Sequence, residues 1–123
     1  MSVVERPLRG ARAWRWTTGS GVLLLALVTV HMVAHHFVVD EIGGLRDYAS
    51  VLDYVSSPII IASEATFLLA VTVHAMLGLR GVLYDLGPNA RVRRRIDVGL
   101  VALGAATVAY GAYLLATLVS RAG

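Results

Sequence analysis

Three long apolar stretches constrain this chain more than any other feature of its sequence. They run over residues 18–39, 58–84 and 98–119, and a transmembrane helix needs about 20 consecutive, mostly apolar residues. Hydrophobic residues make up 57% of the 123 residues and charged residues 15%, whereas soluble domains carry about 25% charged residues. The sequence therefore predicts an all-α membrane protein, with three transmembrane helices in a single domain over residues 1–123.

The composition also excludes several kinds of chemistry. The chain has no cysteine, so it supplies no disulfide, no thiolate metal ligand and no ligand set for an iron–sulfur cluster. Its pI is about 9.8, but the basic residues flank the apolar stretches. There we expect them to contact lipid phosphates rather than nucleic acid. We expect no complete catalytic site within this chain alone.

The arginines predict the direction in which the chain crosses the membrane. The first stretch is preceded by Arg6, Arg9, Arg12 and Arg15, and the third by Arg91, Arg93, Arg94 and Arg95. The loop after the first stretch is acidic instead, with Asp40, Glu41, Asp47 and Asp53. By the positive-inside rule, the N-terminus and the second loop are cytoplasmic and the C-terminus is outside. A cleaved signal peptide is not expected, because the first stretch ends in His-His-Phe-Val-Val-Asp rather than at small residues.

Local signals predict where the elements begin and end. Pro58 suits the first turn of a helix, and Ser56 and Ser57 before it are candidate caps. The run Gly87-Pro88-Asn89 predicts a turn after the second stretch. A short helix on the outer membrane surface is predicted by four apolar residues at helical spacing, Leu45, Tyr48, Leu52 and Val55.

His74, inside the second stretch, is the main functional candidate, because ionisable groups are costly within the hydrocarbon. On a helical wheel its face also holds Phe67, Ala70, Gly78, Gly81 and Asp85. Gly78 and Gly81 leave a strip without side chains on which a porphyrin edge fits, and neutral imidazole is a common axial ligand of haem iron. The same residues also fit a histidine that hydrogen-bonds a neighbouring helix, with the glycines serving close helix packing.

The remaining ionisable residues of the stretches have more than one interpretation. His31 is a candidate ligand of a second haem, whereas the histidines at 35–36 lie near the outer edge, where water is accessible. Glu64 is expected to reach water or to pair with Arg46, and a role in a proton path is the alternative. Arg80 lies off the His74 face near the cytoplasmic edge, where it can snorkel or pair with an acid or a haem propionate.

Aromatic and charged residues gather at the predicted cytoplasmic rim. Trp14, Trp16 and Tyr84 suit the usual role of membrane-interface anchors. Tyr84 and Asp85 also offer a phenol donor and a carboxylate to a quinone, which needs hydrogen-bond donors and takes up protons on reduction. We count Tyr84, Asp85 and Arg15 as candidate quinone-binding residues.

The segment from His74 to Asp85, His-Ala-Met-Leu-Gly-Leu-Arg-Gly-Val-Leu-Tyr-Asp, resembles a known helix. It is similar to the haem-ligand helix of the small hydrophobic anchor subunit, the D subunit, of succinate dehydrogenase, where H-A-x-x-G is followed by D-Y. Arg15-Trp16-Thr17 resembles the family's R-x-[S/T] entry to its first helix. Length, three spans, topology and an acidic first loop extend the resemblance along nearly the whole chain. The sequence departs from the pattern at Leu86, which stands where the family has its quinone tyrosine.

The resemblance implies an anchor subunit of a succinate:quinone oxidoreductase in a prokaryotic cytoplasmic membrane. A flavoprotein subunit, an iron–sulfur subunit and a second hydrophobic anchor are its implied partners, the two anchors forming one bundle. His74 would be one axial ligand of a haem b, with the other histidine supplied by the second anchor. Asp85 matches the family's aspartate beside the quinone, and His31 matches a position that holds a second haem in some members.

Other functions fit part of the same pattern. The anchor of a different quinone-linked dehydrogenase, or of a fumarate reductase, would share the histidines but have other soluble partners. A small proton or ion transport subunit would use Glu64 and the histidines, yet the stretch 98–119 contributes no ionisable residue to a path. A purely structural assembly factor would leave the glycine strip to helix packing.

Overall fold

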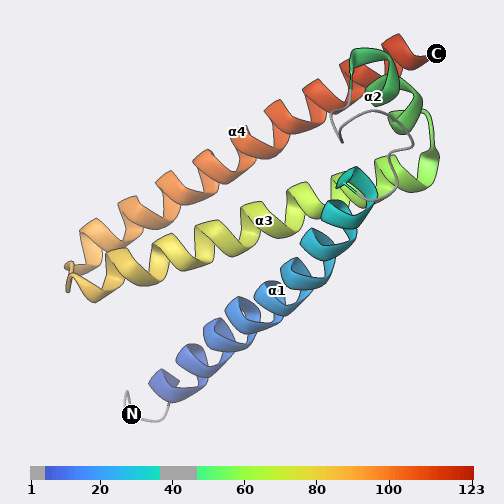
Figure 1. Cartoon of the computed structure of the whole chain (residues 1–123). Helices are drawn as coiled ribbons and strands as arrows, with labels where there is room; N and C mark the ends of the chain where they lie inside the picture. Colours follow the sequence, from blue (N-terminus) through green and yellow to red (C-terminus); the bar gives the residue numbers. More distant parts are fainter. Residues whose placement is uncertain (1–4, 37–46) are drawn as a thin grey trace.

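The chain folds into four helices, described here from a computed structural model (Figure 1). The structure describes the backbone of residues 5–36 and 47–123, and the side chains of residues 10–34 and 47–123. The helices are α1 (Glu5–His36), α2 (Tyr48–Val55), α3 (Pro58–Asp85) and α4 (Ala90–Ala122). Within these described ranges the structure has no strand, as the sequence predicts.

Three of the helices contain a segment long and apolar enough to cross a membrane. These segments are Gly10–Ala34, Pro58–Asp85 and Ala90–Ala122. The second segment closely matches the predicted stretch, but α1 and α4 begin well before theirs. The prediction that residues 91–95 belong to a loop is wrong, because these residues form the first turns of α4. Hydropathy marks only the part of a helix that lies in lipid, whereas arginine has a high helix propensity and lets the helix continue beyond that part.

The ends of α3 follow the local signals closely. Pro58 is the first residue of α3 and Ser57 occupies the N-cap position, although its side chain makes no capping hydrogen bond. Gly87 turns the chain with a φ of 71°, a conformation that favours glycine. Asn89 then caps α4, because its Oδ1 accepts a hydrogen bond from the Val92 backbone N–H at 3.0 Å. A short helix is also present where one is predicted, as α2, whereas Leu45 lies outside the described residues.

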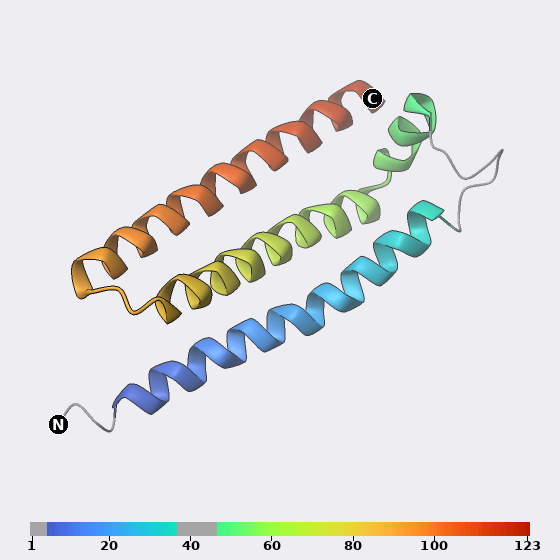
Figure 2. The same ribbon diagram turned by 60° about the vertical axis from the view of Figure 1, so that its left-hand side comes forward.

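The three long helices lie roughly along one another, with α3 in the middle (Figure 2). In the described residues α3 packs against both α1 and α4, which do not contact each other. The start of α1 lies at the same end as the turn between α3 and α4, which we call the turn end (Figure 1). The C-terminus and α2 lie at the opposite end, the α2 end.

Small residues bring α3 and α4 together. A Cβ on the buried Gly104 would lie 3.3 Å from Met76 Cγ, and one on Gly111 would lie 2.6 Å from Leu68 Cδ2. Membrane helices pack in this way, because small residues let their backbones approach. The chain nonetheless exposes 9316 Å², whereas a compact folded monomer of this mass exposes about 6,400 Å². Much of its apolar surface is therefore left for lipid or for other chains.

Candidate functional site

His74 is hydrogen-bonded across the interface between α1 and α3. Its Nδ1 lies 3.0 Å from the Oγ of Ser20. The Ser20 hydroxyl has a single proton, which it donates to the carbonyl of Thr17 at 2.9 Å. With that proton on Thr17, the Ser20 oxygen is placed to accept a proton carried by His74 Nδ1, in the ring tautomer that has its proton there. In the neutral imidazole the lone pair is then on Nε2, which is the nitrogen left for a metal.

Gly21 allows this close approach of α1 to His74. A Cβ built on Gly21 would lie 3.7 Å from His74 Nδ1 and only 3.2 Å from His74 Cε1. The second distance is shorter than an ordinary carbon–carbon contact of about 3.5–4.0 Å. Sequence reasoning missed both Ser20 and Gly21. The available signal was the run of small residues Gly19-Ser20-Gly21 in an apolar stretch, since small residues mark helix interfaces in membranes.

The glycine strip beside His74 is open, as the sequence predicts. A Cβ added to Gly78 or to Gly81 would meet no atom within 4 Å. These glycines therefore do not serve contacts with the described residues of this chain. Among those residues there is also no group of three or more side chains able to hold a metal ion. The site can offer one imidazole nitrogen beside a flat surface, which suits a metal ion that already has other ligands.

A second histidine cluster lies toward the α2 end and joins three helices. His31 Nδ1, on α1, lies 3.1 Å from Glu64 Oε1 on α3. The Tyr54 hydroxyl, on α2, donates to the same oxygen at 3.4 Å. The His31 ring also stacks on Phe67, with centroids 5.2 Å apart and planes at 15°. The predicted pairing of Glu64 with Arg46 lies outside the described residues.

At the turn end a network of three polar side chains joins α3 to α4. Arg80 Nε donates to Asp97 Oδ1 at 2.7 Å, and its Nη2 donates to the Tyr84 hydroxyl at 3.0 Å. The Tyr84 hydroxyl in turn donates to Asp97 Oδ2 at 2.8 Å. The guanidinium groups of Arg80 and Arg93 lie 4.1 and 5.0 Å from the centre of the Tyr84 ring. Of the three interpretations of Arg80, pairing with an acid is the one that the structure shows.

Asp97 was missed because it stands one residue before the predicted third stretch. Only the longer α4 brings it opposite Arg80. The sequence did carry a signal for it. Asp97 borders an apolar stretch at the same predicted membrane edge as Arg80, and a charged residue at the edge of a membrane span usually has a partner. Residues 98–119 contain no acidic, basic or histidine side chain, but the whole of α4 does, since it includes Asp97 and the arginines before it.

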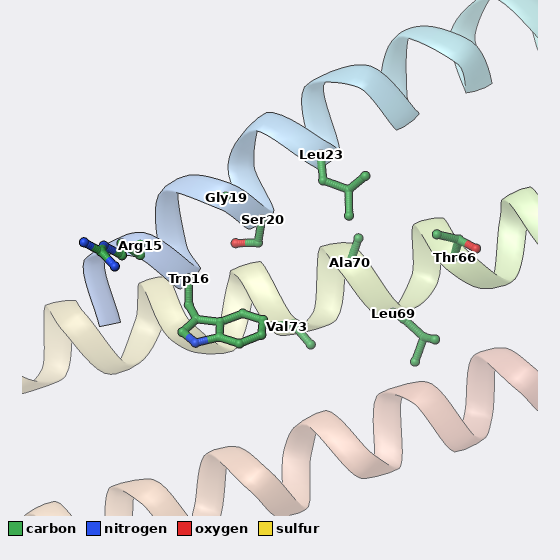
Figure 3. Close-up of a pocket in the computed structure, with 9 residues that line it drawn as sticks. All are labelled: Arg15, Trp16, Gly19, Ser20, Leu23, Thr66, Leu69, Ala70 and Val73. Atoms are coloured by element: carbon green, nitrogen blue, oxygen red, sulfur yellow. The ribbon is translucent and has the colours of Figure 1, made fainter. Parts of the chain in front are cut away.

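The candidate quinone residues fall into separate places. Arg15 lines a cavity of about 380 Å³ between α1 and α3, together with Trp16 and Ser20. Figure 3 shows the Trp16 ring and the Ser20 hydroxyl pointing from α1 toward α3. The Tyr84 hydroxyl instead faces Asp97 on α4, and Asp85 is exposed at the end of α3. The remaining lining residues of the cavity are Gly19, Leu23, Thr66, Leu69, Ala70 and Val73.

Comparison with known proteins identifies the family. Residues 4–113 match the model of the succinate dehydrogenase/fumarate reductase transmembrane subunit. The chain belongs to this family. It is 38% identical, over 84% of its length and 86% of the relative's, to the succinate dehydrogenase hydrophobic membrane anchor subunit of Archaeoglobus fulgidus. It is 28% identical, over 83% of its length and 80% of the relative's, to the subunit of the same name from Thermoplasma acidophilum.

This protein is thus a membrane anchor subunit of the succinate dehydrogenase/fumarate reductase family, with three helices able to cross a membrane. Membership implies that it works together with other subunits of such a complex. It also accounts for the large exposed apolar surface of the anchor, since helices of a membrane complex meet lipid and other chains.

Proposed function

We propose that this anchor subunit binds haem b through His74 and forms part of the quinone site of a succinate:quinone oxidoreductase. A second hydrophobic anchor would supply the other axial histidine and complete the bundle. Electrons would come from an iron–sulfur subunit, which receives them from a flavoprotein that oxidises succinate. The observation that carries the proposal is the 3.0 Å hydrogen bond between His74 Nδ1 and Ser20 Oγ, because it occupies Nδ1 and leaves Nε2 as the nitrogen that can face a haem iron.

Two further features of the His74 site fit a haem. The open surface at Gly78 and Gly81 accepts a flat ring beside α3 without a clash against a Cβ. A hydrogen bond on the far nitrogen of a metal-bound histidine is the usual arrangement, since it orients the ring and strengthens it as a ligand. A bound haem supplies one-electron redox chemistry, and its potential depends on its axial ligands and their hydrogen bonds. This chain's own contribution is to hold the imidazole in position.

The turn end is the proposed cytoplasmic side. Arg12 and Arg15 of α1 and the arginines at the start of α4 belong to this one end of the molecule. This clustering supports the orientation by the positive-inside rule. The soluble subunits would dock on this side, in a prokaryotic cytoplasmic membrane, and the quinone would meet the electrons there.

In the quinone site we assign distinct roles to the three candidate residues. Arg15 would donate to a quinone carbonyl from the cavity that it lines with Trp16. Asp85 is exposed at the same end and would pass protons from water. The proton of the Tyr84 hydroxyl already binds Asp97, so Tyr84 can donate to a quinone only after that hydrogen bond opens. Reduction of the quinone consumes two electrons and two protons.

The test of haem binding is a reduced-minus-oxidised absorbance spectrum of the purified complex. We expect a b-type signal that is lost or strongly reduced in His74→Ala. The matched control is His36→Ala, which removes a histidine expected at the edge of the membrane and should leave the signal of a His74-bound haem intact. A complex without any haem signal would overturn the haem proposal and favour the ion-path or assembly interpretation, while family membership would stand.

A further inference from the structure

A cavity of about 470 Å³ lies between α3 and α4, and neither the haem nor the quinone proposed above uses it. Arg80 and Asp97 line it at the turn end, and apolar residues make up nearly all of the remaining lining. Thr72 is also polar, but its hydroxyl donates to a backbone carbonyl within α3 at 2.7 Å. Along α4 the apolar lining runs from Leu100 to Val108, which is about 12 Å at 1.5 Å per residue. The cavity is therefore an apolar groove along two helices, with its charged residues at one end.

The groove is open on the side that faces away from the helix pair. Val101 on α4 is 72% exposed and Val73 on α3 is 47% exposed, although both line the groove. Both belong to segments long and apolar enough to cross a membrane, where lipid tails are as apolar as these side chains. A groove that runs along membrane-crossing helices has the direction and the chemistry of a lipid hydrocarbon chain.

Helix geometry places one arginine in line with the groove. Arg94, Val101 and Val108 are seven residues apart on the continuous helix α4. Seven residues make about two full turns, so these three residues share one face. Arg94 is exposed and lies about 10 Å beyond Val101 along the helix axis. Arg95, the next residue, is rotated by about 100° from this face.

The end of the groove where Arg94 lies has a surplus of positive charge. Residues 80–97 include five arginines and two aspartates. Asp97 already pairs with Arg80 at 2.7 Å, so most of the surplus belongs to the arginines at the start of α4. Anionic lipids attract arginines that lie near the membrane surface. This charge favours an anionic amphiphile as the occupant over a purely apolar helix of another subunit.

We propose that the groove between α3 and α4 binds one anionic phospholipid. One hydrocarbon chain of the lipid lies along Val101 and Val108, and its phosphate binds Arg94 at the turn end. The ion pair of Arg80 with Asp97 stays intact beside the headgroup. This site is independent of haem and quinone binding, because it uses none of the residues assigned to them.

Native mass spectrometry of the purified, delipidated complex, titrated with phosphatidylglycerol, tests the proposal. We expect a tight site for this lipid and weaker binding of phosphatidylcholine with the same chains, because its headgroup has no net charge. Arg94→Gln should weaken the tight site about fivefold, the equivalent of about 1 kcal/mol for one arginine near an anionic surface. The matched control is Arg95→Gln, which removes the same charge from the neighbouring position and should weaken the site less.

A second pair of variants tests the groove itself. Ala105 and Ala106 are both exposed on α4, but only Ala105 lines the groove. Ala105→Trp puts a large side chain into the groove and should remove the tight site, whereas Ala106→Trp should keep it. The two arginine positions precede the apolar stretch 98–119, so they decide the question even where a tryptophan variant fails to assemble.

Four results would overturn the lipid site. Equal weakening in Arg94→Gln and Arg95→Gln would show only a general attraction between charges. Equal affinity of the native complex for the two lipids would exclude recognition of an anion. Unchanged binding in an assembled Ala105→Trp complex would place the lipid outside the groove. A native complex without any tight site would mean that another subunit covers the groove, while the proposed function at His74 would stand.

Discussion

Substituting Gly21 by alanine should weaken haem binding by this anchor subunit while leaving its stability nearly unchanged. The new Cβ would lie 3.2 Å from His74 Cε1. Reaching an ordinary contact of about 3.5 Å requires a shift of roughly 0.3 Å. Moving the imidazole by this amount away from α1 stretches its 3.0 Å hydrogen bond to Ser20, which nears the length at which such bonds weaken.

Two opposing effects determine the stability of Gly21→Ala. Alanine in place of glycine within a helix stabilises the fold by about 1 kcal/mol. Weakening one hydrogen bond costs about 0.5–1.5 kcal/mol, so the net change in the free energy of unfolding should be close to zero. The affinity for haem has no such compensation, because the higher helix propensity of alanine does not restore the hydrogen bond on His74. Loss of an outer-shell contact typically weakens metal binding by about 10- to 100-fold.

The assay is the haem content per complex, measured by absorbance after purification, together with a thermal unfolding curve. We expect Gly21→Ala to lose haem during dilution while its unfolding midpoint stays near that of the native protein. Gly10→Ala is the matched control, because Gly10 is also on α1 and its added Cβ would meet nothing within 4 Å. If the two variants retain haem equally well, the proposed contact between Gly21 and a haem-ligating His74 is refuted.

Three further substitutions test the fold. Asp97→Ala should destabilise the turn end by about 1 kcal/mol in an unfolding assay, a modest loss because its ion pair with Arg80 is about 40% exposed. In Asp47→Ala the start of α2 should fray, seen as faster amide exchange. The hydrogen bond from the Ser50 backbone lowers the pKa of Asp47, so in the native protein this cap should hold at neutral pH and be lost as the pH falls below about 4. Gly104→Leu should cost about 1–3 kcal/mol by forcing α3 and α4 apart, with the exposed Gly99→Leu as its control.

Each of these three predictions has an outcome that would contradict it. A native-like unfolding curve for Asp97→Ala would mean that the network does not join α3 to α4. Asp47→Asn keeps an acceptor for the cap but has no charge to titrate, so pH-dependent fraying in that variant would contradict the role of the carboxylate. Equal destabilisation by the two glycine substitutions would show that the packing of Gly104 against Met76 is not what the fold depends on.

The predictions from sequence succeeded where the signal is local. The turn at Gly87, the start of α3 at Pro58 and the short helix α2 each depend on residues close together in the chain. The starts of α1 and α4 were misplaced, because hydropathy reports contact with lipid and not where helical hydrogen bonding begins. The same error hid Asp97, which lies in the polar first part of α4.

The sequence by itself determined that the chain folds in lipid, how many of its helices can cross a membrane, and which histidine lies beside a glycine strip. These follow from composition and spacing along a single helix. Only the tertiary structure decided that His74 bonds Ser20, that His31 bonds Glu64 and that Tyr84 turns toward Asp97. Apolar side chains cover nearly every side of these helices, so hydropathy does not indicate which face meets which neighbour. That choice depends on how closely small residues such as Gly21 and Gly104 let the backbones approach.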